Sequence, residues 1–280
     1  MTDKISDTEF SRIQKIMFEK VGVSIGPAKR ALVVGRLARR LRHHNLQTFS
    51  EYLQLVERQG VEGEWQIMMD LLTTHETYFF REPKHFDFLR THAQQHAAQR
   101  EEFRVWSAAC SSGEEAYSIA MTLENVMPGR DWQVLASDVS RRMVDESEQG
   151  IYPHGRVAKV PRELMEKYFL RGVRSQAGKY LVSKDLRRHM EFKQLNLNDP
   201  MSMDIGLFNM IFLRNVLIYF NPEQKKQIVN RLVSHLKPGG YLLVGHSETL
   251  NGVNAKVSPV APSIYRREVQ VLSQHKAVGE

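Results

Sequence analysis

The 280-residue sequence predicts an α/β sheet domain that follows a small, all-helical domain. Two observations predict the sheet domain. Residues 103–109 form a short apolar run that passes through the small residues Cys110 to Gly113 into a helical pattern, which indicates strand, tight turn and helix. A second strand pattern, at 133–137, ends in Asp138, as strands do at binding sites on the carboxyl edge of parallel sheets. A third observation, helical periodicity without strand patterns up to residue 72, predicts the helical domain.

The two strand ends together suggest a nucleoside-containing ligand. Gly113 would let a backbone approach the ligand closely, the helix start would present free N–H groups, and Glu115 adds a carboxylate at the mouth of the turn. The run has one glycine where a dinucleotide fingerprint has three, and it lacks the Gly-Lys-Ser/Thr ending of a phosphate-binding loop. These absences argue against NAD and ATP and leave a phosphate-free nucleoside as the simpler ligand.

The charge of the chain is concentrated near its start. The formal net charge is +7, and residues 1–60 hold 11 Lys and Arg against 6 Asp and Glu. Such a positive face indicates an acidic macromolecule as partner, which could be nucleic acid, anionic lipid or an acidic protein surface.

Cellular location is also constrained by composition. No apolar run approaches the ~20 residues of a membrane span, and no signal-like leader is seen, so neither membrane insertion nor export is expected. The single cysteine, Cys110, cannot form an internal disulfide, which favours a reducing cytoplasm. We interpret Cys110 as a small turn residue and not as a nucleophile, because the sequence suggests no histidine partner for it.

Residues 1–73 are predicted to form the helical domain, with a first helix that ends near 22–27 and later helices that end near 43, 58 and 72. The first helix begins with a capping box, Ser6 to Glu9. At 100° per residue, the second helix places Arg36, Arg39 and Arg40 opposite its apolar face, and it contains no acidic residue. Like charges along a helix destabilise it, so a docking face for an acidic partner is the favoured interpretation. A merely solvated face is the alternative.

Residues 74–84 are predicted to link the two domains and to contribute to the binding site. This stretch is polar, then aromatic, and stops at Pro83, where a new helix begins. Thr74, Thr77 and Arg81 lie in the linker and are free to reach a site.

No metal site is predicted from the histidines. His75-Glu76 matches the start of a zinc-protease motif, but Phe79 stands where the second histidine belongs. His92 and His96 share a helix face without an acidic or cysteine ligand nearby in the sequence.

Residues 85–280 are predicted to form the sheet domain, with residues 150–186 inserted as a β-subdomain. Two strand patterns in the insertion, 168–172 and 179–183, predict a hairpin with an open edge that could accept an extended peptide. An insertion that only covers the sheet is an equally good interpretation of the pattern.

The strand and helix alternation resumes after the insertion. Strands are predicted at 190–197 and from 207 to Leu213, and Arg214 and Asn215 leave the second one at its carboxyl end, where ligand sites lie. A helix from Pro222 to Leu236, a turn at 237–240 and a further strand follow. Residues 257–260 and 263–267 are predicted to form a final antiparallel pair.

Taken together, these residues resemble the CheR family of chemotaxis receptor methyltransferases, which use S-adenosylmethionine to methylate glutamate side chains. The matching elements cover about 71–267 and are LTTHETYFFRE, RVWSAACSSGEEAYSIAM, the strand end at Asp138, LNL at 195–197, FLRNVLIYF, LKPGGYLLVGHSE and the terminal IYRR. The basic N-terminal helices also fit the family. The resemblance implies a Rossmann-like class I methyltransferase domain with an inserted antiparallel β-subdomain, preceded by a small all-α domain that docks to the receptor.

The resemblance also implies roles for individual residues. Tyr219 occupies the position that lies near the transferred methyl in the family, and Arg81 and Tyr219 are candidates for aligning the substrate carboxylate. One departure from the family is His75, where asparagine is usual, although imidazole can also donate a hydrogen bond. Cofactor contacts are expected from His75, Thr77, Arg81, Glu115, Asp138, Asn196, Leu197, Arg214 and Asn215. The product, S-adenosylhomocysteine, is expected to bind as well.

Some members of the family tether themselves through the β-subdomain to a pentapeptide at the receptor's C-terminus. Arg171, Gly172 and Gly178 match the tethering pattern, but Leu181 stands where a second arginine is expected. Lys179 would point to the same face of a strand and supply the charge. A tether of moderate affinity is therefore expected, together with receptor docking through Arg36, Arg39 and Arg40.

Two other classes of function are alternatives to a receptor methyltransferase. A nucleic-acid amino-methyltransferase would carry an Asp/Asn-Pro-Pro-aromatic motif after the fourth strand, where this chain has Arg214-Asn215-Val216-Leu217, so no nucleic acid is expected as substrate. A cofactor-binding sensor without catalysis is the other alternative. The chain is expected to act as a cytoplasmic monomer.

Overall fold

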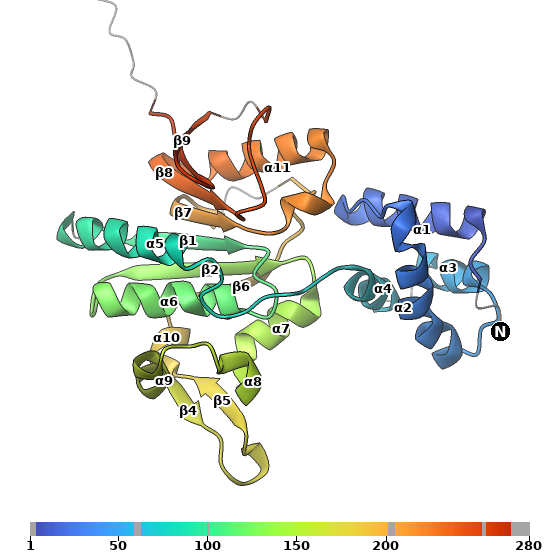
Figure 1. Cartoon of the computed structure of the whole chain (residues 1–280), viewed down its shortest axis with the longest axis horizontal. Helices are drawn as coiled ribbons and strands as arrows, with labels where there is room; N and C mark the ends of the chain where they lie inside the picture. The colour runs from blue at the N-terminus through green and yellow to red at the C-terminus, as the bar shows by residue number, and fades with distance from the viewer. Residues whose placement is uncertain (1–3, 59–62, 100, 201–204, 254–255, 270–280) are drawn as a thin grey trace, which may run out of the picture.

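The computed structural model describes residues 4–58, 63–99, 101–200, 205–253 and 256–269. Figure 1 shows a helical domain, an α/β sheet domain and a small β-subdomain that projects from the sheet domain. The linker between the helical domain and the sheet domain crosses the end of the sheet (Figure 1).

The helical domain is built from short, capped helices around one core. Its elements are α1 (Asp7–Val21), η1 (Pro27–Lys29), α2 (Arg30–His43), α3 (Phe49–Glu57) and α4 (Glu64–Leu72). Capping boxes start α1 at Ser6 and α3 at Thr48, so the box predicted at Ser6 is confirmed. Buried apolar side chains from these helices, among them Ile13, Leu37 and Leu53, share a single core.

The sheet domain has a parallel sheet that is extended by an antiparallel pair. Across the sheet the strands are β6 (Met190–Gln194), β2 (Trp132–Asp138), β1 (Phe103–Ala108), β7 (Phe208–Leu213), β8 (Leu236–Val244), β10 (Ile264–Arg267) and β9 (Val257–Ala261). The first five are mutually parallel, and β10 pairs antiparallel with β8 and β9. The predicted α/β class and the predicted final antiparallel pair are confirmed.

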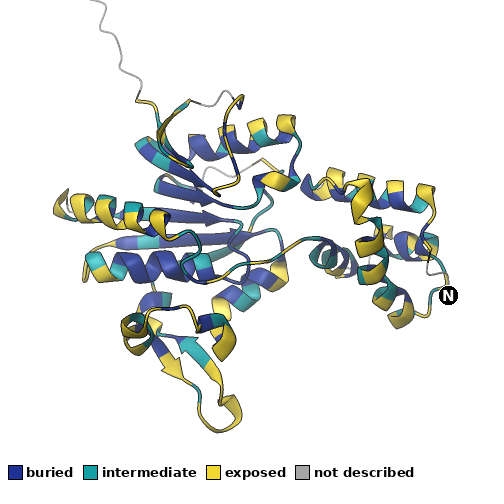
Figure 2. Ribbon diagram, viewed as in Figure 1, coloured by how far each residue is buried: buried dark blue, intermediate teal, exposed yellow. Residues whose placement is uncertain are grey.

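Helices cover both faces of this sheet. They are α5 (Pro83–His96), α6 (Glu114–Val126), α7 (Arg141–Gln149) and α11 (Pro222–Ser234), with short 3-10 turns η2 (Ala97–Gln99) and η5 (Leu217–Tyr219). In β2, Val134 and Ala136 join the core under α5 and α6, whereas Leu135 joins the core under α11. Figure 2 shows the central strands as almost wholly buried, as expected for a parallel sheet between two helical layers. Within the described ranges, none of the helices combines the length and apolarity that crossing a lipid bilayer requires.

The structure of the β-subdomain differs from the prediction by one additional strand. It contains β3 (Ile151–Pro153), α8 (His154–Val157), α9 (Arg162–Tyr168), β4 (Phe169–Arg171), η3 (Arg174–Gln176), β5 (Lys179–Val182) and α10 (Lys184–Arg187). The sequence predicted only the β4–β5 hairpin, but β3 also pairs with β5, so β5 is the central strand and the edges belong to β3 and β4. The third strand was missed because it is short and contains Pro153, which argues against a strand in a sequence pattern.

A second correction concerns residues 237–240, which were predicted to be a turn before a strand. In the structure they belong to β8, where Leu236 pairs with Phe208 but Tyr241 already pairs with Met210, so the intervening residues form a bulge. Gly239 has φ +75°, and a Cβ at Gly240 would lie 2.9 Å from the carbonyl oxygen of Asn209. The glycines are therefore required by the bulge.

Candidate active site

A cavity lies at the carboxyl ends of the parallel strands, where the linker and the end of α1 meet the sheet. It encloses about 1060 Å³ of empty space, part of it open to solvent. Every residue that the sequence assigned to the cofactor or to methyl transfer lines it: His75, Thr77, Arg81, Glu115, Asp138, Asn196, Leu197, Arg214, Asn215 and Tyr219. These residues come from separate segments and meet because parallel strands end at the same edge.

Asp138, the last residue of β2, is buried beneath the cavity with a relative exposure of 5%. Its Oδ2 accepts a hydrogen bond from Ser111 N at 2.9 Å, and its Oδ1 accepts one from Ser140 N at 2.9 Å. Burial raises the pKa of Asp138, while the hydrogen bonds from these backbone amides oppose that effect. The carboxylate thus orders the turns after β1 and β2, and each oxygen keeps a lone pair for a hydroxyl donor.

The turn after β1 explains why small residues follow the strand. The amides of Ala109 and Cys110 both donate to the carbonyl of Ser137, which holds the turn against the end of β2. One expectation is wrong here, because Gly113 makes room for protein and not for a ligand. A Cβ at Gly113 would lie 2.3 Å from Ser147 Oγ and 2.9 Å from Tyr152 Oη.

Cys110 is buried in this turn and lines the cavity. Burial raises the pKa of its thiol well above the usual value, and the negative charges of Asp138 and Glu115 add to the effect. A thiol held in its protonated form is a poor nucleophile.

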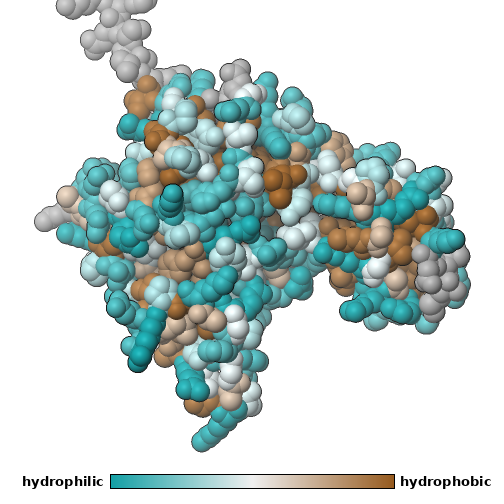
Figure 3. All heavy atoms as spheres, viewed as in Figure 1, coloured by the Kyte–Doolittle hydropathy of each residue, from teal (hydrophilic) through white to brown (hydrophobic). Residues whose placement is uncertain are grey.

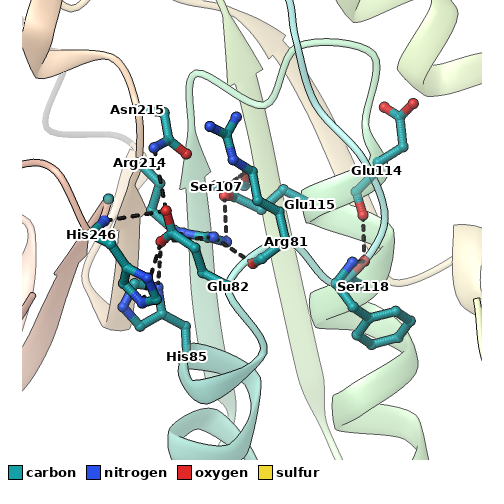
Figure 4. A network of polar contacts seen from close by, with 12 residues as sticks. Arg81, Glu82, His85, Ser107, Glu114, Glu115, Ser118, Arg214, Asn215 and His246 are labelled. Atoms are coloured by element: carbon teal, nitrogen blue, oxygen red, sulfur yellow. Dashed lines mark hydrogen bonds and ion pairs between the residues drawn. The ribbon is translucent and has the colours of Figure 1, made fainter. Parts of the chain in front are cut away.

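Arg214 lies at the centre of a charge network beside the cavity (Figure 4). Its side chain is 1% exposed and forms ion pairs with Glu115 at 3.1 Å and with Glu82 at 3.0 Å. Glu115 also accepts a hydrogen bond from Ser107 Oγ at 2.7 Å. Burial raises the pKa of Glu115, and the charge of Arg214 opposes that effect. For Glu82, burial would raise the pKa, but the charge of Arg214 and hydrogen bonds from His246, Arg214 and Asn215 lower it overall.

Glu82, His85 and His246 place ligand atoms within 4.8 Å of one another, which is the kind of group that could hold a metal ion. Both oxygens of Glu82 already accept hydrogen bonds, from Asn215, His246 N and Arg214. A cation bound there would have to displace the guanidinium of Arg214. We therefore assign the carboxylate to the charge network. Burial, with the charge of Arg214, lowers the pKa of His85 to about 4.

The linker reaches the cavity as the sequence predicts. His75 Nε2 lies 2.8 Å from Thr73 Oγ1, and the carbonyl of His75 accepts a hydrogen bond from Ser111 Oγ at 3.2 Å. Arg81 donates one hydrogen bond to the carbonyl of Glu76 at 3.0 Å, and the rest of its guanidinium borders the cavity.

The helical domain supplies part of the cavity wall, which the sequence did not predict. Val21, Val23 and Lys29 line the cavity, and Lys29 Nζ lies 5.2 Å from the centre of the Tyr219 ring. Asn196 Nδ2 donates to the carbonyl of Lys20 at 2.8 Å, so a predicted cofactor residue also joins the two domains. No pattern in the sequence signals these contacts, because the partners lie far apart along the chain.

Other lining residues could have been found. Val139, Leu195 and Phe220 each lie next to a predicted site residue, namely Asp138, Asn196 and Tyr219. Residues next to a strand end share its edge of the sheet, so this signal was available and was not used.

The basic residues of α2 have unequal surroundings. Arg36 donates to the carbonyls of Leu71 and Thr73, at 2.7 and 2.9 Å. Arg40 forms an ion pair with the buried Glu64. Arg39 is exposed and has no ion-pair partner among the described residues. The absence of acidic residues within the helix was a correct observation, but α4 supplies the counter-charge for Arg40.

In the β-subdomain, Arg171 ends β4 opposite Tyr180 of β5. Gly172 donates its N–H to the carbonyl of Lys179 at 2.8 Å, and a Cβ there would lie 2.1 Å from the carbonyl oxygen of Gln176. Gly178 has φ +82°, which favours glycine at that turn. Arg171 and Lys179 are exposed, and Leu181 is half-buried.

Comparisons with known proteins cover almost the whole chain. The family description "CheR methyltransferase, SAM binding domain" matches residues 75–265, and "CheR methyltransferase, all-alpha domain" matches residues 8–73. The chemotaxis protein methyltransferase of Escherichia coli (strain K12) is 38% identical over 270 residues, which are 95% of this chain and 93% of the relative. The chemotaxis protein methyltransferase of Salmonella typhimurium is 37% identical over 276 residues, which are 98% of this chain and 93% of the relative. Chemotaxis protein methyltransferase 2 of Pseudomonas aeruginosa is 37% identical over 259 residues, 92% of each. The chain therefore belongs to the CheR methyltransferase family.

Proposed function

We propose that this protein transfers the methyl group of S-adenosylmethionine to glutamate side chains of chemoreceptors and so forms glutamate methyl esters for sensory adaptation. The observation that supports this most strongly is the cavity at the strand ends, which gathers all the residues expected to contact the cofactor in a chain that belongs to the CheR methyltransferase family. The products are a receptor methyl ester and S-adenosylhomocysteine.

The residues around the cavity fit this cofactor. Asp138 offers carboxylate oxygens to the ribose hydroxyls, because one lone pair of each oxygen remains after the bonds to Ser111 and Ser140. Glu115 offers a carboxylate to the amino group of the methionine part, while Arg214 and Arg81 offer positive charge to its carboxylate. When bound, S-adenosylmethionine supplies an electrophilic methyl group on a positively charged sulfur.

The substrate side of the reaction needs positioning more than acid–base chemistry. A glutamate side chain is ionised at neutral pH, with a reference pKa of ~4.3, so it would need no general base to accept the methyl group. Arg81, in the linker, and Tyr219, in η5, both line the cavity and would align the incoming carboxylate. Closure of the site by the receptor would exclude water.

Receptor recognition is proposed to use surfaces outside the cavity. The exposed Arg39 and its neighbour Arg42 on α2 would steer the protein to an acidic receptor surface, and Lys29 carries positive charge from the same domain to the cavity wall. The β-subdomain would hold an acidic, aromatic-containing C-terminal pentapeptide by strand addition at the edge of β4, next to Arg171. We further propose a cytoplasmic monomer, in keeping with the lone buried cysteine.

Transfer of a tritiated methyl group tests this function. The purified protein is incubated with labelled S-adenosylmethionine and either receptor-rich membranes or nucleic acid. Base-labile counts on the receptor are expected, because methyl esters hydrolyse in mild base. Counts on nucleic acid alone would indicate the nucleic-acid class, and cofactor binding without transfer to either acceptor would indicate a sensor.

A further inference from the structure

The carboxylates of Glu82 and Glu248 contact two residues that line the cavity, although neither glutamate is among the described lining residues itself. Glu82 precedes α5, and Glu248 follows β8. Both contact the Arg214-Asn215 dipeptide, which leaves β7 and lines the cavity. The bonds join segments separated by as many as 133 residues.

Glu82 holds the side chains of this dipeptide (Figure 4). Its Oε2 accepts from Arg214 Nε at 3.3 Å and lies 3.0 Å from Arg214 Nη2. Its Oε1 accepts from Asn215 Nδ2 at 3.3 Å and from His246 N at 3.2 Å. Arg214 in turn holds two other segments, because its Nη1 donates to Glu115 and its Nη2 donates to the carbonyl of Arg81.

Glu248 holds the backbone of the same segment. Its Oε2 accepts from Asn215 N at 2.8 Å and from Gly245 N at 2.7 Å, and its Oε1 accepts from Leu217 N at 2.7 Å. These bonds fix the loop between β7 and η5, which carries Tyr219 to the cavity. Glu248 is 8% exposed, so the bonds are shielded from water.

The backbone provides independent evidence that this arrangement is constrained. Glu82 and Asn215 both have left-handed backbone angles, with φ +59° and +57°, which non-glycine residues adopt only where the surroundings hold them. Gly245 faces the pair, and a Cβ there would lie 2.5 Å from Asn215 Nδ2 and 2.9 Å from Glu248 Oε2. Asn215 and Glu248 thus occupy the space that a side chain at residue 245 would need.

We propose that Glu82 and Glu248 are positioning residues for the cofactor, which act by fixing Arg214 and Asn215 in the geometry that the cavity requires. This inference rests on the proposed function. Without Glu82, Arg214 keeps its contact with Glu115, but Arg214 Nε and Asn215 Nδ2 lose their acceptor, so neither side chain is held in one position at the cavity. Without Glu248, the amides of Asn215 and Leu217 lose their acceptor and the loop relaxes.

Calorimetry with S-adenosylhomocysteine on the full-length protein tests the proposal. Glu82→Gln and Glu248→Gln keep the shape of each side chain and remove its charge. Each is expected to raise the Kd about tenfold with unchanged stoichiometry, since hydrogen bonds to a charged acceptor are the stronger ones. The KM for S-adenosylmethionine should rise by more than kcat falls, because the restraint concerns binding of the cofactor.

Two comparisons separate positioning from a general loss of stability. Glu64→Gln removes a carboxylate that is even more deeply buried and that binds Arg40 and Tyr52 in the helical domain, and it should leave the Kd unchanged. In an Arg214→Lys background, Glu82→Gln should change the Kd no more than about twofold, because the two effects share one route and are not additive. Wild-type affinity in Glu82→Gln or Glu248→Gln, or an equal loss in Glu64→Gln, would overturn the proposal. Failure of the wild-type protein to bind would instead contradict the proposed function.

Discussion

Asp138 is the residue on which the proposed cofactor site depends most. It is buried, it accepts hydrogen bonds from the backbone of two turns, and it lines the cavity. A carboxylate in this place both builds the site and offers acceptors to a ribose. Its substitution should therefore affect ligand binding far more than substitution of an exposed carboxylate just before the start of the same strand.

The first prediction is that Asp138→Asn, and more strongly Asp138→Ala, weakens S-adenosylhomocysteine binding. A lost hydrogen bond to a charged group corresponds to about 1.5–3 kcal/mol, which is roughly a tenfold to hundredfold rise in Kd. Calorimetry measures it. Asp131→Ala is the control, because Asp131 is exposed at the opposite end of β2. Wild-type affinity in both Asp138 variants would remove the ribose assignment.

His85 gives a prediction for stability against pH. Its pKa is lowered to about 4 in the folded protein, against about 6.5 when unfolded, so the unfolded chain binds a proton first as the pH falls. The stability is fully present above pH ~6.5 and declines down to pH ~4, by about 3 kcal/mol in all, at 1.36 kcal/mol per unit. In His85→Gln, urea unfolding at several pH values should show this slope removed.

The matched control for that experiment is His43→Gln, since His43 is exposed on α2. It should keep the wild-type slope. An identical slope in wild type and His85→Gln would show that other groups cause the loss of stability in acid.

The place of a residue at the edge of the sheet could be predicted from the sequence where the residue ends a predicted strand. It could not be predicted where it depends on a contact with a residue far along the chain. Asp138, Arg214 and Asn215 follow strand patterns, so their place at one edge could be inferred. Glu82 and Glu248 gave no such signal, because their role depends on contacts made across the fold.

At the scale of elements, α2 illustrates how packing reassigns charges that a helical projection treats alike. Arg36 donates hydrogen bonds to two carbonyls at the end of α4, and Arg40 forms an ion pair with Glu64 at the start of α4. Arg39 and Arg42, by contrast, are exposed. Figure 3 shows apolar atoms gathered on the visible face of the helical domain, so its surface is not uniformly charged. The electrostatic part of docking is therefore expected from the exposed pair.

The prediction for this helix is that Arg39→Glu with Arg42→Glu raises the KM for receptor while the affinity for S-adenosylhomocysteine stays unchanged. Charge reversal on an exposed face acts through long-range attraction, so the effect should shrink as salt is added. Arg130→Glu with Lys256→Glu is the control, with the same change of charge on the sheet domain. Equal receptor kinetics in the two variants at low salt would mean that the face is only solvated.

The β-subdomain shows why short strands limit prediction from sequence. The β4–β5 hairpin was predicted, but β3 pairs with β5 over only Ile151–Pro153, too short for a pattern to reveal. The consequence for binding is that a peptide can add to β4 or β3 and not to β5.

A tether at this edge is testable by titration with a pentapeptide that contains aromatic and acidic residues. Binding tighter than ~100 μM is expected, roughly −5.5 kcal/mol, and Arg171→Ala should weaken it. The control is Arg162→Ala, because Arg162 is also exposed but starts α9 and not a strand. No binding at that concentration would indicate an enzyme that works without a tether.

For the whole molecule, the important feature is that two domains share one cavity. Ser24 N donates to the carbonyl of Tyr219 at 2.9 Å, and a Cβ at Gly22 would lie 2.8 Å from Gln224 Nε2. The helical domain thus packs directly against the segment that follows β7. The α/β class and the alternation of the main strands and helices could be predicted from periodicity, but this contact could not, since it depends on three-dimensional docking.

The shared cavity also suggests how receptor docking and methyl transfer cooperate. A receptor held by the helical domain would present its glutamates beside Lys29 and Tyr219, at the border between the domains.

The most direct test of the central claim is mass spectrometry of receptor peptides after incubation with the protein and S-adenosylmethionine. Glutamate side chains should gain the mass of one methylene group, lose it after mild base, and gain almost none with Asp138→Ala. Unmodified glutamates after incubation with a preparation that binds S-adenosylhomocysteine, or a methyl group that resists base, would contradict it.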